Sequence, residues 1–368
     1  MKPLFLLHFS AIIMTCAGQS MPSQQLNQFP EKYANDNVIQ KRRQNVRIVF
    51  YNVENLYDPY NDSLKMDDEF TPAGVRHWTW SRFREKLNHV AKTFLAMGKS
   101  EPPAIIGMCE VENKYVLNKL VHESPLQRFT YRIIHHESPD LRGVDVAMIY
   151  RPDKFSPVTW QAYPVRFPFD TVSQTREILM VKGILFETDT IYLFINHWPS
   201  RRGGYKESQP RRNYVASRVR SICDSLFQAD QDSRIILMGD LNDEPDKESL
   251  VLYLNTKQDT INIKPTDLIN LMFPKMRRWD EGTIKYQGQW SIFDQFIVSG
   301  NLITGSSGIT TSFRDAQIFN SPVLTIEDGK NFGVRLNRTY TGPRYTGGFS
   351  DHLPIFLDLW KSDQELGH

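Results

Sequence analysis

The chain has 368 residues, a length within reach of one large α/β domain or two smaller ones. Its formal net charge is only +2, so no global basic field indicates a nucleic-acid partner, and any site for a polyanion must be a local patch. Its three cysteines form no disulfide framework and have no spacing typical of a zinc centre. We expect Cys109 and Cys223, which lie in apolar contexts, to be buried free thiols.

Residues 1–20 have the pattern of a secretory signal peptide. Lys2 precedes an apolar stretch from Leu4 to Met14, and small residues follow it. This stretch is too short to span a membrane, so we expect no transmembrane segment in the mature chain. In the alternative interpretation Cys16 is lipidated and the protein is a lipoprotein. Both interpretations predict export, to the periplasm or to the outside of the cell.

Residues 21–45 are polar and predict a linker or N-terminal arm, followed by one folded domain over residues 46–362. Two helices are expected from apolar residues at helical spacing, over residues 80–97 and 211–228, with Pro210 near the start of the second. The strand candidates are 47–53, 104–112, 143–151, 177–187, 190–198, 234–242, 293–300 and 353–360. Residues 177–198 look like a hairpin, and the whole pattern predicts packed sheets covered by helices.

Polar side chains gather at the ends of these predicted strands, where loops present functional groups on a rigid scaffold. Any one of them could be a turn or helix cap instead, but six strand ends with such residues are unlikely to arise by chance. The residues are Asn52, Glu54, Glu110, Glu112, Asn196, His197, Asp240, Asn242, Asp294, Asp351 and His352.

The stretch "GDLNDEP" shows how such a strand end could work. Asp240 and Asn242 are two residues apart, so on an extended backbone they face the same side and can reach one water. The following acids, Asp243 and Glu244, then cap the turn before Pro245. This arrangement predicts that Asp240 and Asn242 position an attacking water.

These residue types favour one kind of chemistry. Asn and carboxylate oxygens are hard ligands that suit Mg²⁺, with Mn²⁺ or Ca²⁺ as alternatives. The sequence contains no Gly-rich phosphate loop and no G-x-S-x-G nucleophile motif. A metal, a water-orienting Asp/Asn pair and two histidines are suited to phosphoester hydrolysis.

A local basic segment follows His197. Between Arg201 and Arg220 there are seven Lys or Arg residues and one acid, Glu207. Arg201 and Arg202 are nearest to the predicted site in sequence, and guanidinium groups can grip phosphates. The alternative is a solvated basic helix face.

The motifs "NVEN", "EVEN", "INHW", "GDLN", "FDQF" and "SDH", in this order, resemble those of the endonuclease/exonuclease/phosphatase superfamily over residues 46–360. The resemblance implies a four-layer α/β sandwich of the deoxyribonuclease-I type, with two mostly antiparallel β-sheets between helices. It makes residues 46–362 a catalytic domain. It implies that Glu110 is the main metal ligand, with Asn52 and Asp351 near the metal or its waters.

The resemblance also implies catalytic roles. Asp240 and Asn242 would activate the attacking water, and His352, oriented by Asp294, would contact the scissile phosphate. His197 would stabilise the developing charge or assist the leaving group, with Asp145 as the residue that orients it.

We therefore expect an exported, metal-dependent nuclease that acts on DNA or RNA as a monomer without a stable protein partner. The alternatives are a hydrolase of phospholipids (sphingomyelinase-like) or of small phosphate esters, and a non-catalytic binding protein on the same scaffold. Residues 301–349 are expected to fold over the rim of the site. Tyr340 and Tyr345 in this segment could stack on bases, but we favour packing.

Overall fold

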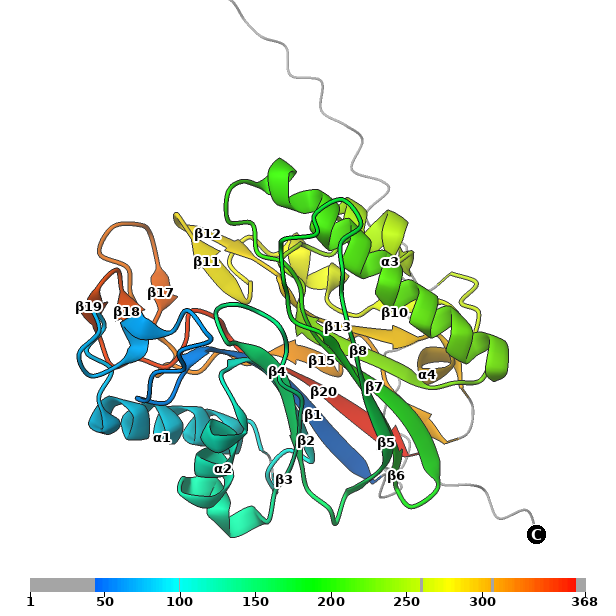
Figure 1. The fold of residues 1–368 in the computed structure, drawn as a ribbon. Helices are drawn as coiled ribbons and strands as arrows, with labels where there is room; N and C mark the ends of the chain where they lie inside the picture. Colours follow the sequence, from blue (N-terminus) through cyan, green and yellow to red (C-terminus); the bar gives the residue numbers. More distant parts are fainter. Residues whose placement is uncertain (1–43, 99, 259–260, 306–307, 362–368) are drawn as a thin grey trace, which may run out of the picture. The chain divides into compact units, whose positions relative to one another are not determined.

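The strands predicted from the sequence belong to two large β-sheets (Figure 1). The computed structural model describes residues 44–98, 100–258, 261–305 and 308–361. The predicted signal peptide and the predicted arm up to residue 43 lie outside these ranges. In the ranges described, no helix is both long and apolar enough to cross a membrane.

The first sheet has the strand order β14-β20-β1-β2-β4-β3, and β15 pairs with β20. The pairs are antiparallel except β1 with β2. Its strands are β1 (Asn45–Leu56), β2 (Ile105–Val111), β3 (Arg132–His135), β4 (Asp145–Tyr150), β14 (Ile309–Thr310), β15 (Ala316–Ile318) and β20 (Ile355–Lys361).

The second sheet has the order β5-β6-β7-β8-β13-β10-β9. Here β7 with β8 and β10 with β9 are parallel, and the other pairs are antiparallel. Its strands are β5 (Phe155–Tyr163), β6 (Ile178–Leu185), β7 (Asp189–His197), β8 (Ile235–Asp240), β9 (Thr256–Lys257), β10 (Leu268–Asn270) and β13 (Asp294–Ser299). The predicted hairpin over 177–198 is confirmed as the pair β6–β7.

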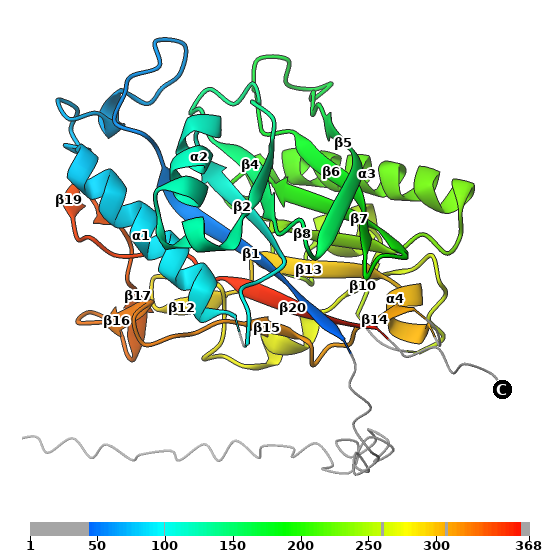
Figure 2. The ribbon, with the colours of Figure 1, turned by 90° about the horizontal axis from the view of Figure 1, so that it is seen from below.

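Helices cover the outer faces of the two sheets, in four layers (Figure 2). Helices α1 (Trp80–Ala96) and α2 (Lys114–His122) lie against the first sheet, and α3 (Tyr205–Ala229) lies against the second. Alternation along β1 shows the reason. Ile48 and Phe50 face the core between the sheets, whereas Val49 and Tyr51 face the core under α1 and α2. Both faces of the strand are thus buried, which explains its nearly continuous apolar sequence. The predicted four-layer sandwich is confirmed.

Short elements complete the fold. They are the helix α4 (Asn301–Thr304), the hairpins β11 (Ile284–Tyr286) with β12 (Gln289–Ser291), β16 (Thr325–Glu327) with β17 (Val334–Leu336) and β18 (Tyr340–Thr341) with β19 (Arg344–Tyr345), the 3₁₀ turns Asp68–Phe70, Pro125–Phe129 and Phe273–Arg277, and the π-helical turn Ser249–Tyr253.

Two helix predictions need correction. Helix α3 begins at Tyr205, six residues before the predicted start, so Pro210 lies inside it. A tertiary ion pair stabilises this early part of the helix, because Arg212 is fully buried with its Nε 2.8 Å from Oδ2 of Asp243. Helix α2 was not predicted. Its nine residues are too few for a clear periodic pattern, although Asn113 accepts the N–H of Val116 as an N-terminal cap.

The segment 301–349 borders the first sheet and the site described below. Tyr340 is buried and packs edge-on against Tyr345 and Phe70, with ring centroids 5.3 and 6.3 Å away. The hydroxyl of Tyr345 donates to Glu85. The two tyrosines therefore pack within the protein, as expected.

Candidate active site

The polar strand ends meet where the two sheets face each other. In the second sheet, Asp240 lies opposite both His197 and Asp294 in the strand register. In the first sheet, Asn52 at the end of β1 lies opposite Cys109 in β2. A hydrogen bond of 3.1 Å from Nδ2 of Asn52 to Oδ2 of Asp240 joins the two sheets. The fold thus brings residues far apart in the sequence to one edge of the sandwich.

Irregular backbone at the ends of β1 and β2 aims the side chains of this site. The β1–β2 register shifts between Asn52 and Leu56, and the β2–β4 register shifts between Cys109 and Val111. Glu110 lies in the second irregularity with a φ of 62°, in the left-handed region that residues other than glycine seldom adopt. Bulges of this kind redirect side chains next to active sites. Here the redirected carboxylate of Glu110 accepts the amide of Asn52 (3.4 Å).

Asp240 is the central carboxylate of the site. Its Oδ2 lies 3.7 Å from Nε2 of His197 and 3.8 Å from Nε2 of His352, in addition to its bond with Asn52. Its Oδ1 accepts the backbone N–H of Asn242. Burial raises the pKa of Asp240 to about 6, although His352 acts in the opposite direction. A carboxylate with such a pKa is suited to accept a proton near neutral pH.

His352 and Asp294 form a buried pair. Nδ1 of His352 lies 2.6 Å from Oδ2 of Asp294, as the family resemblance implies. Burial alone would lower the pKa of His352, but the carboxylates of Asp294 and Asp240 raise it well above its ordinary value. His352 therefore carries a positive charge, with Nε2 directed towards Asp240.

His197 is in a different electrostatic state. Burial lowers its pKa well below the ordinary value, and the positive charges of Arg176, Arg142 and His352 lower it further. Its ring is therefore neutral. Arg176 holds the backbone at this strand end, because its guanidinium donates to the carbonyls of His197 (3.2 Å) and Trp198 (2.6 Å).

The assignment of Asp145 as the residue that orients His197 is wrong. Both oxygens of Asp145 are engaged elsewhere, with Oδ2 3.0 Å from Nε2 of His135 and Oδ1 accepting the N–H of Ser138. Nδ1 of His197 is buried and has no hydrogen-bond partner among the described residues. The competing histidine on the neighbouring strand β3 could not be recognised from the sequence.

Asn242 and Arg201 also differ from expectation. Asn242 is not on an extended backbone, because its φ is 51°, and its Nδ2 donates to the carbonyl of Trp198 (3.1 Å). Arg201 points back to this loop, where Nε donates to the carbonyl of Asn242 and Nη2 lies 3.1 Å from Oδ1 of Asp243. Arg201 thus fixes the loop after Asp240, and its guanidinium is not turned outward as a phosphate contact would require. Arg202 is exposed, as a phosphate contact requires.

The basic segment is largely paired within the protein. Besides Arg201, Arg212 pairs with Asp243, Arg211 with Asp170, and Arg220 with Asp224. Four of its seven basic side chains are thus paired with three carboxylates, which reduces the positive charge available to a polyanion.

Asp351 belongs to a charged group that no sequence pattern indicated. Nη2 of Arg338 lies 2.8 Å from Oδ2 of Asp351, and its Nε lies 3.2 Å from Oε1 of the buried Glu54. Thr339 donates its N–H to the other oxygen of Glu54 and accepts a hydrogen bond from Lys86 (2.6 Å). A lysine within the apolar stripe of the predicted helix 80–97 was a visible signal, whereas Arg338 had none.

The exposed side of the site has the donors that a hard cation needs. Glu110 and Asp351 are partly exposed, and together with Glu54 they raise the pKa of Arg338 against the effect of burial. Shared partners link these carboxylates, because Arg338 contacts both Asp351 and Glu54, and Asn52 contacts Glu110 and the N–H of Glu54. A magnesium ion needs only one or two carboxylates plus waters, so the donor set fits. Asn52 keeps one amide-oxygen lone pair for this purpose, because the N–H of Glu54 occupies the other.

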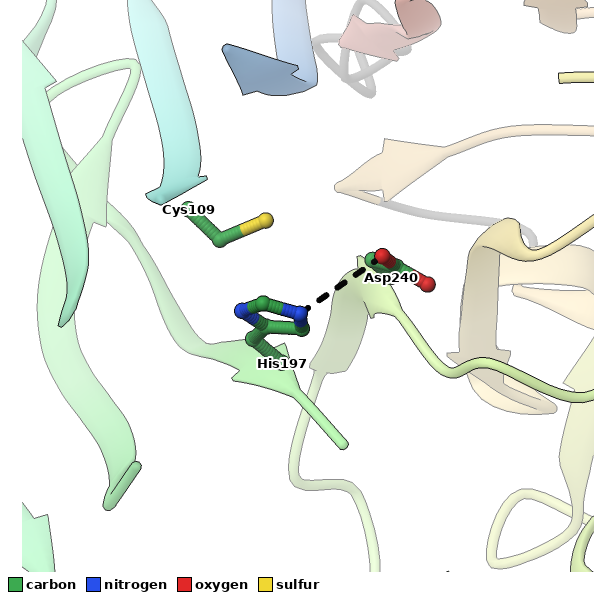
Figure 3. A group of neighbouring side chains, drawn as sticks. All are labelled: Cys109, His197 and Asp240. Atoms are coloured by element: carbon green, nitrogen blue, oxygen red, sulfur yellow. Dashed lines mark ion pairs between the residues drawn. The ribbon is translucent and has the colours of Figure 1, made fainter. Parts of the chain in front are cut away.

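A second set of possible ligands lies deeper. Cys109, His197 and Asp240 each offer one ligand atom, and these atoms lie within 4.8 Å of one another (Figure 3). The only other such group of three in the described ranges is His135, Glu137 and Asp145.

Comparisons with known proteins bear on the family and the fold. A family model described as "Endonuclease/Exonuclease/phosphatase family" matches residues 47–361. No curated protein matches the sequence significantly.

Solved structures with the same fold come from several sources. An endonuclease/exonuclease/phosphatase family protein from Bacteroides thetaiotaomicron is 14% identical, with a TM-score of 0.54, 88% of this chain and 100% of that chain covered. A mannosyl-6-phosphatase from the same organism is 17% identical, with a TM-score of 0.52, and the coverage is 85% and 99%. TDP2 of D. rerio in complex with a single-strand DNA product is 14% identical, with a TM-score of 0.50, and the coverage is 86% and 99%. Such identities establish the fold alone, whereas the family model matches most of the sequence. The chain belongs to the endonuclease/exonuclease/phosphatase family.

Proposed function

We propose that this protein is an exported, Mg²⁺-dependent phosphodiesterase that hydrolyses DNA or RNA. The observation that carries the reaction type is the placement of Asp240 between a neutral His197 and a cationic His352. Family membership supports a phosphoesterase hydrolase. The metal, the nucleic-acid substrate and export are the parts that need experiments.

The side chains divide the work of hydrolysis among them. Asp240 accepts the proton of the attacking water, and Asn52 holds its carboxylate in place through the 3.1 Å hydrogen bond. His352, kept charged by Asp294, donates a charged hydrogen bond to a phosphate oxygen as negative charge develops. A bound Mg²⁺, held by Glu110 and Asp351 with Asn52 beside it, would supply Lewis-acid stabilisation of that charge. Neutral His197, whose Nε2 lies 3.7 Å from Oδ2 of Asp240, would donate a hydrogen bond to the phosphate or the leaving group on the side of Asp240 opposite His352.

The substrate test uses the purified protein with plasmid DNA, RNA, sphingomyelin and a panel of phosphate monoesters. We expect cleavage of a nucleic acid that depends on Mg²⁺ or Mn²⁺ and stops when EDTA removes the metal. The nuclease proposal is wrong if neither nucleic acid is cleaved in the presence of a divalent cation.

Variants then test the site itself. Asp240→Asn and His352→Asn should abolish the activity and leave the circular dichroism spectrum unchanged. His135→Asn is the matched control, because His135 is also a buried histidine beside a carboxylate but lies outside this cluster. Full activity of both site variants would show that the site is assigned wrongly, and absence of activity on every substrate would favour a non-catalytic binding protein.

A small phosphate ester is the second candidate substrate, and one observation favours it. The internal ion pairs of the basic segment leave Arg202 as the exposed guanidinium that is nearest to His197 in sequence. One such group suits a compact phosphate better than a long strand. Hydrolysis of monoesters without nucleic-acid cleavage would decide for this candidate.

Export is proposed from residues 1–20 alone. Cell fractionation, with the N-terminal sequence of the mature protein, tests it. A chain that keeps Lys2 and stays in the cytoplasm would refute export, and a lipid on Cys16 would establish the lipoprotein alternative.

A further inference from the structure

Three side chains from three different strands converge behind the surface of the site. Cys109 comes from β2, His197 from β7 and Asp240 from β8. All three are buried, and one ligand atom of each lies within 4.8 Å of the others. Figure 3 shows the thiol and the carboxylate on adjacent sides of the imidazole ring.

The donor types of this group differ from those at the exposed side of the site. Glu110, Asp351 and Asn52 offer oxygen atoms, which magnesium prefers. A thiolate, an imidazole and a carboxylate are the ligands of zinc, which binds three protein ligands and leaves a fourth position open in many sites. The two sets can therefore discriminate between hard and softer cations by ligand type.

The separation of two of the three ligand atoms suits one tetrahedral ion, and the Cys109 sulfur, which lies within 4.8 Å of both, must move closer by up to about 1 Å. Zinc lies about 2.0–2.3 Å from such ligands, so neighbouring ligand atoms are separated by roughly 3.3–3.7 Å. Nε2 of His197 is 3.7 Å from Oδ2 of Asp240 and 3.9 Å from Oε1 of Glu110. A water can occupy the fourth position, because Glu110 belongs to the oxygen-donor set.

The imidazole of His197 is not held by a hydrogen bond. Its Nδ1 is buried and has no partner among the described residues that would fix the ring, so the ring can present a nitrogen to an ion. When the Cys109 sulfur binds the ion, its proton passes to solvent and a thiolate–metal bond forms. The alternative is that Cys109 is only a packing residue of the core between the sheets, to which it also belongs.

We propose that Cys109, His197 and Asp240 form a second metal site, which takes Zn²⁺ or a similar thiophilic divalent cation and switches the enzyme off. Occupation removes Asp240 from proton transfer and His197 from the substrate, so this ion and the reaction exclude each other. Binding of the ion does not depend on the proposed reaction, whereas the inhibition does.

Cobalt provides a direct test of binding. Co²⁺ bound to a thiolate gives a charge-transfer absorption band in the near ultraviolet, and Zn²⁺ should displace it. We expect the band to saturate at one equivalent of Co²⁺ per full-length chain. The band should be lost in Cys109→Ser and Cys109→Ala and retained in Cys223→Ser. Cys223 is the matched control, because it is an equally buried thiol in a different core, and Cys16 stays unchanged in every variant.

Inhibition provides the second readout. With Mg²⁺ in excess, Zn²⁺ should inhibit the wild type, and replacing Cys109 should raise the concentration for half-inhibition by at least about tenfold. The two Cys109 variants should keep the activity measured without Zn²⁺, and thermal melts verify that they are folded.

Two results would overturn the proposal. They are the absence of a thiolate band in the wild type and its persistence after Cys109 is replaced. Equal zinc inhibition of the wild type and the Cys109 variants would refute the link to inhibition. Failure of the nuclease proposal would leave the cobalt result intact, so the two proposals are tested separately.

Discussion

The pair of Asp294 and His352 gives the most decisive prediction about the reaction. In Asp294→Asn the side chain keeps its shape but loses its charge, and the 2.6 Å contact with Nδ1 of His352 no longer favours the charged imidazole. The pKa of His352 should therefore fall, because Asp294 is the largest cause that raises it. Positioned acid–base groups typically contribute about 10²–10⁴-fold to rate. We expect kcat to fall by this factor, which corresponds to about 3–5 kcal/mol of barrier.

The assay is turnover of the substrate identified above, measured with a double-mutant cycle. If Asp294 acts through His352, then Asp294→Asn should have little further effect once His352 is replaced by Asn. Asp145→Asn is the matched control, because Asp145 is also a buried carboxylate 3.0 Å from a histidine, His135. Its kcat should stay within a few-fold of the wild type. Independent, additive effects of Asp294→Asn and His352→Asn would refute the reasoning, and a large loss in Asp145→Asn would reinstate Asp145 as a residue that acts on the site.

Two further predictions concern positioning and stability. Arg201→Ala should lower the free energy of unfolding by about 1–2 kcal/mol and reduce kcat, because Arg201 bonds to Asp243 and to the loop carbonyl of Asn242. Arg202→Ala should leave the free energy of unfolding unchanged and weaken binding of the substrate only at low salt. If urea unfolding shows that both variants lose the same stability, this distinction between Arg201 and Arg202 is wrong. Burial lowers the pKa of Lys86 from 10.5 to about 8, so between these pH values the unfolded chain binds more protons and stability should rise with pH. In Lys86→Met this rise of the unfolding free energy, which is at most about 3 kcal/mol, should disappear. The prediction is wrong if urea unfolding shows the same change of stability with pH, from pH 8 to 10.5, in the wild type and the variant.

Local patterns were sufficient to predict eight of the longer strands, two helices and many residues of the site. Apolar runs marked β1 and β8, and the polar residues that follow them marked Asn52 and Asp240 at strand ends. The helix over 80–97 was nearly correct because its apolar stripe is long and regular. The start of α3 was missed because Pro210 is normally a boundary signal, and a buried ion pair of Arg212 overrides it.

Partner choice could not be predicted from these patterns. The sequence presents Asp145, Arg201 and Arg338 as polar residues without indicating what each one contacts. Asp145 pairs with His135 because β3 and β4 are neighbours in the sheet, and Arg201 pairs with Asp243 because the loop before α3 lies beside the loop after β8. Such pairings depend on distances between elements, which local propensity does not contain.

The sequence by itself determined the kinds of chemical group available, their order along the chain and their positions at strand ends, because these follow from hydrophobic periodicity and residue type. Only the tertiary structure decided which groups meet and in which protonation state. Two bulges aim Glu110 into the site, and burial together with neighbouring charges makes His197 neutral and His352 cationic. The proximity of Cys109 to His197 was likewise decided by the tertiary structure, because these residues, from strands of different sheets, become neighbours only when the two sheets pack face to face.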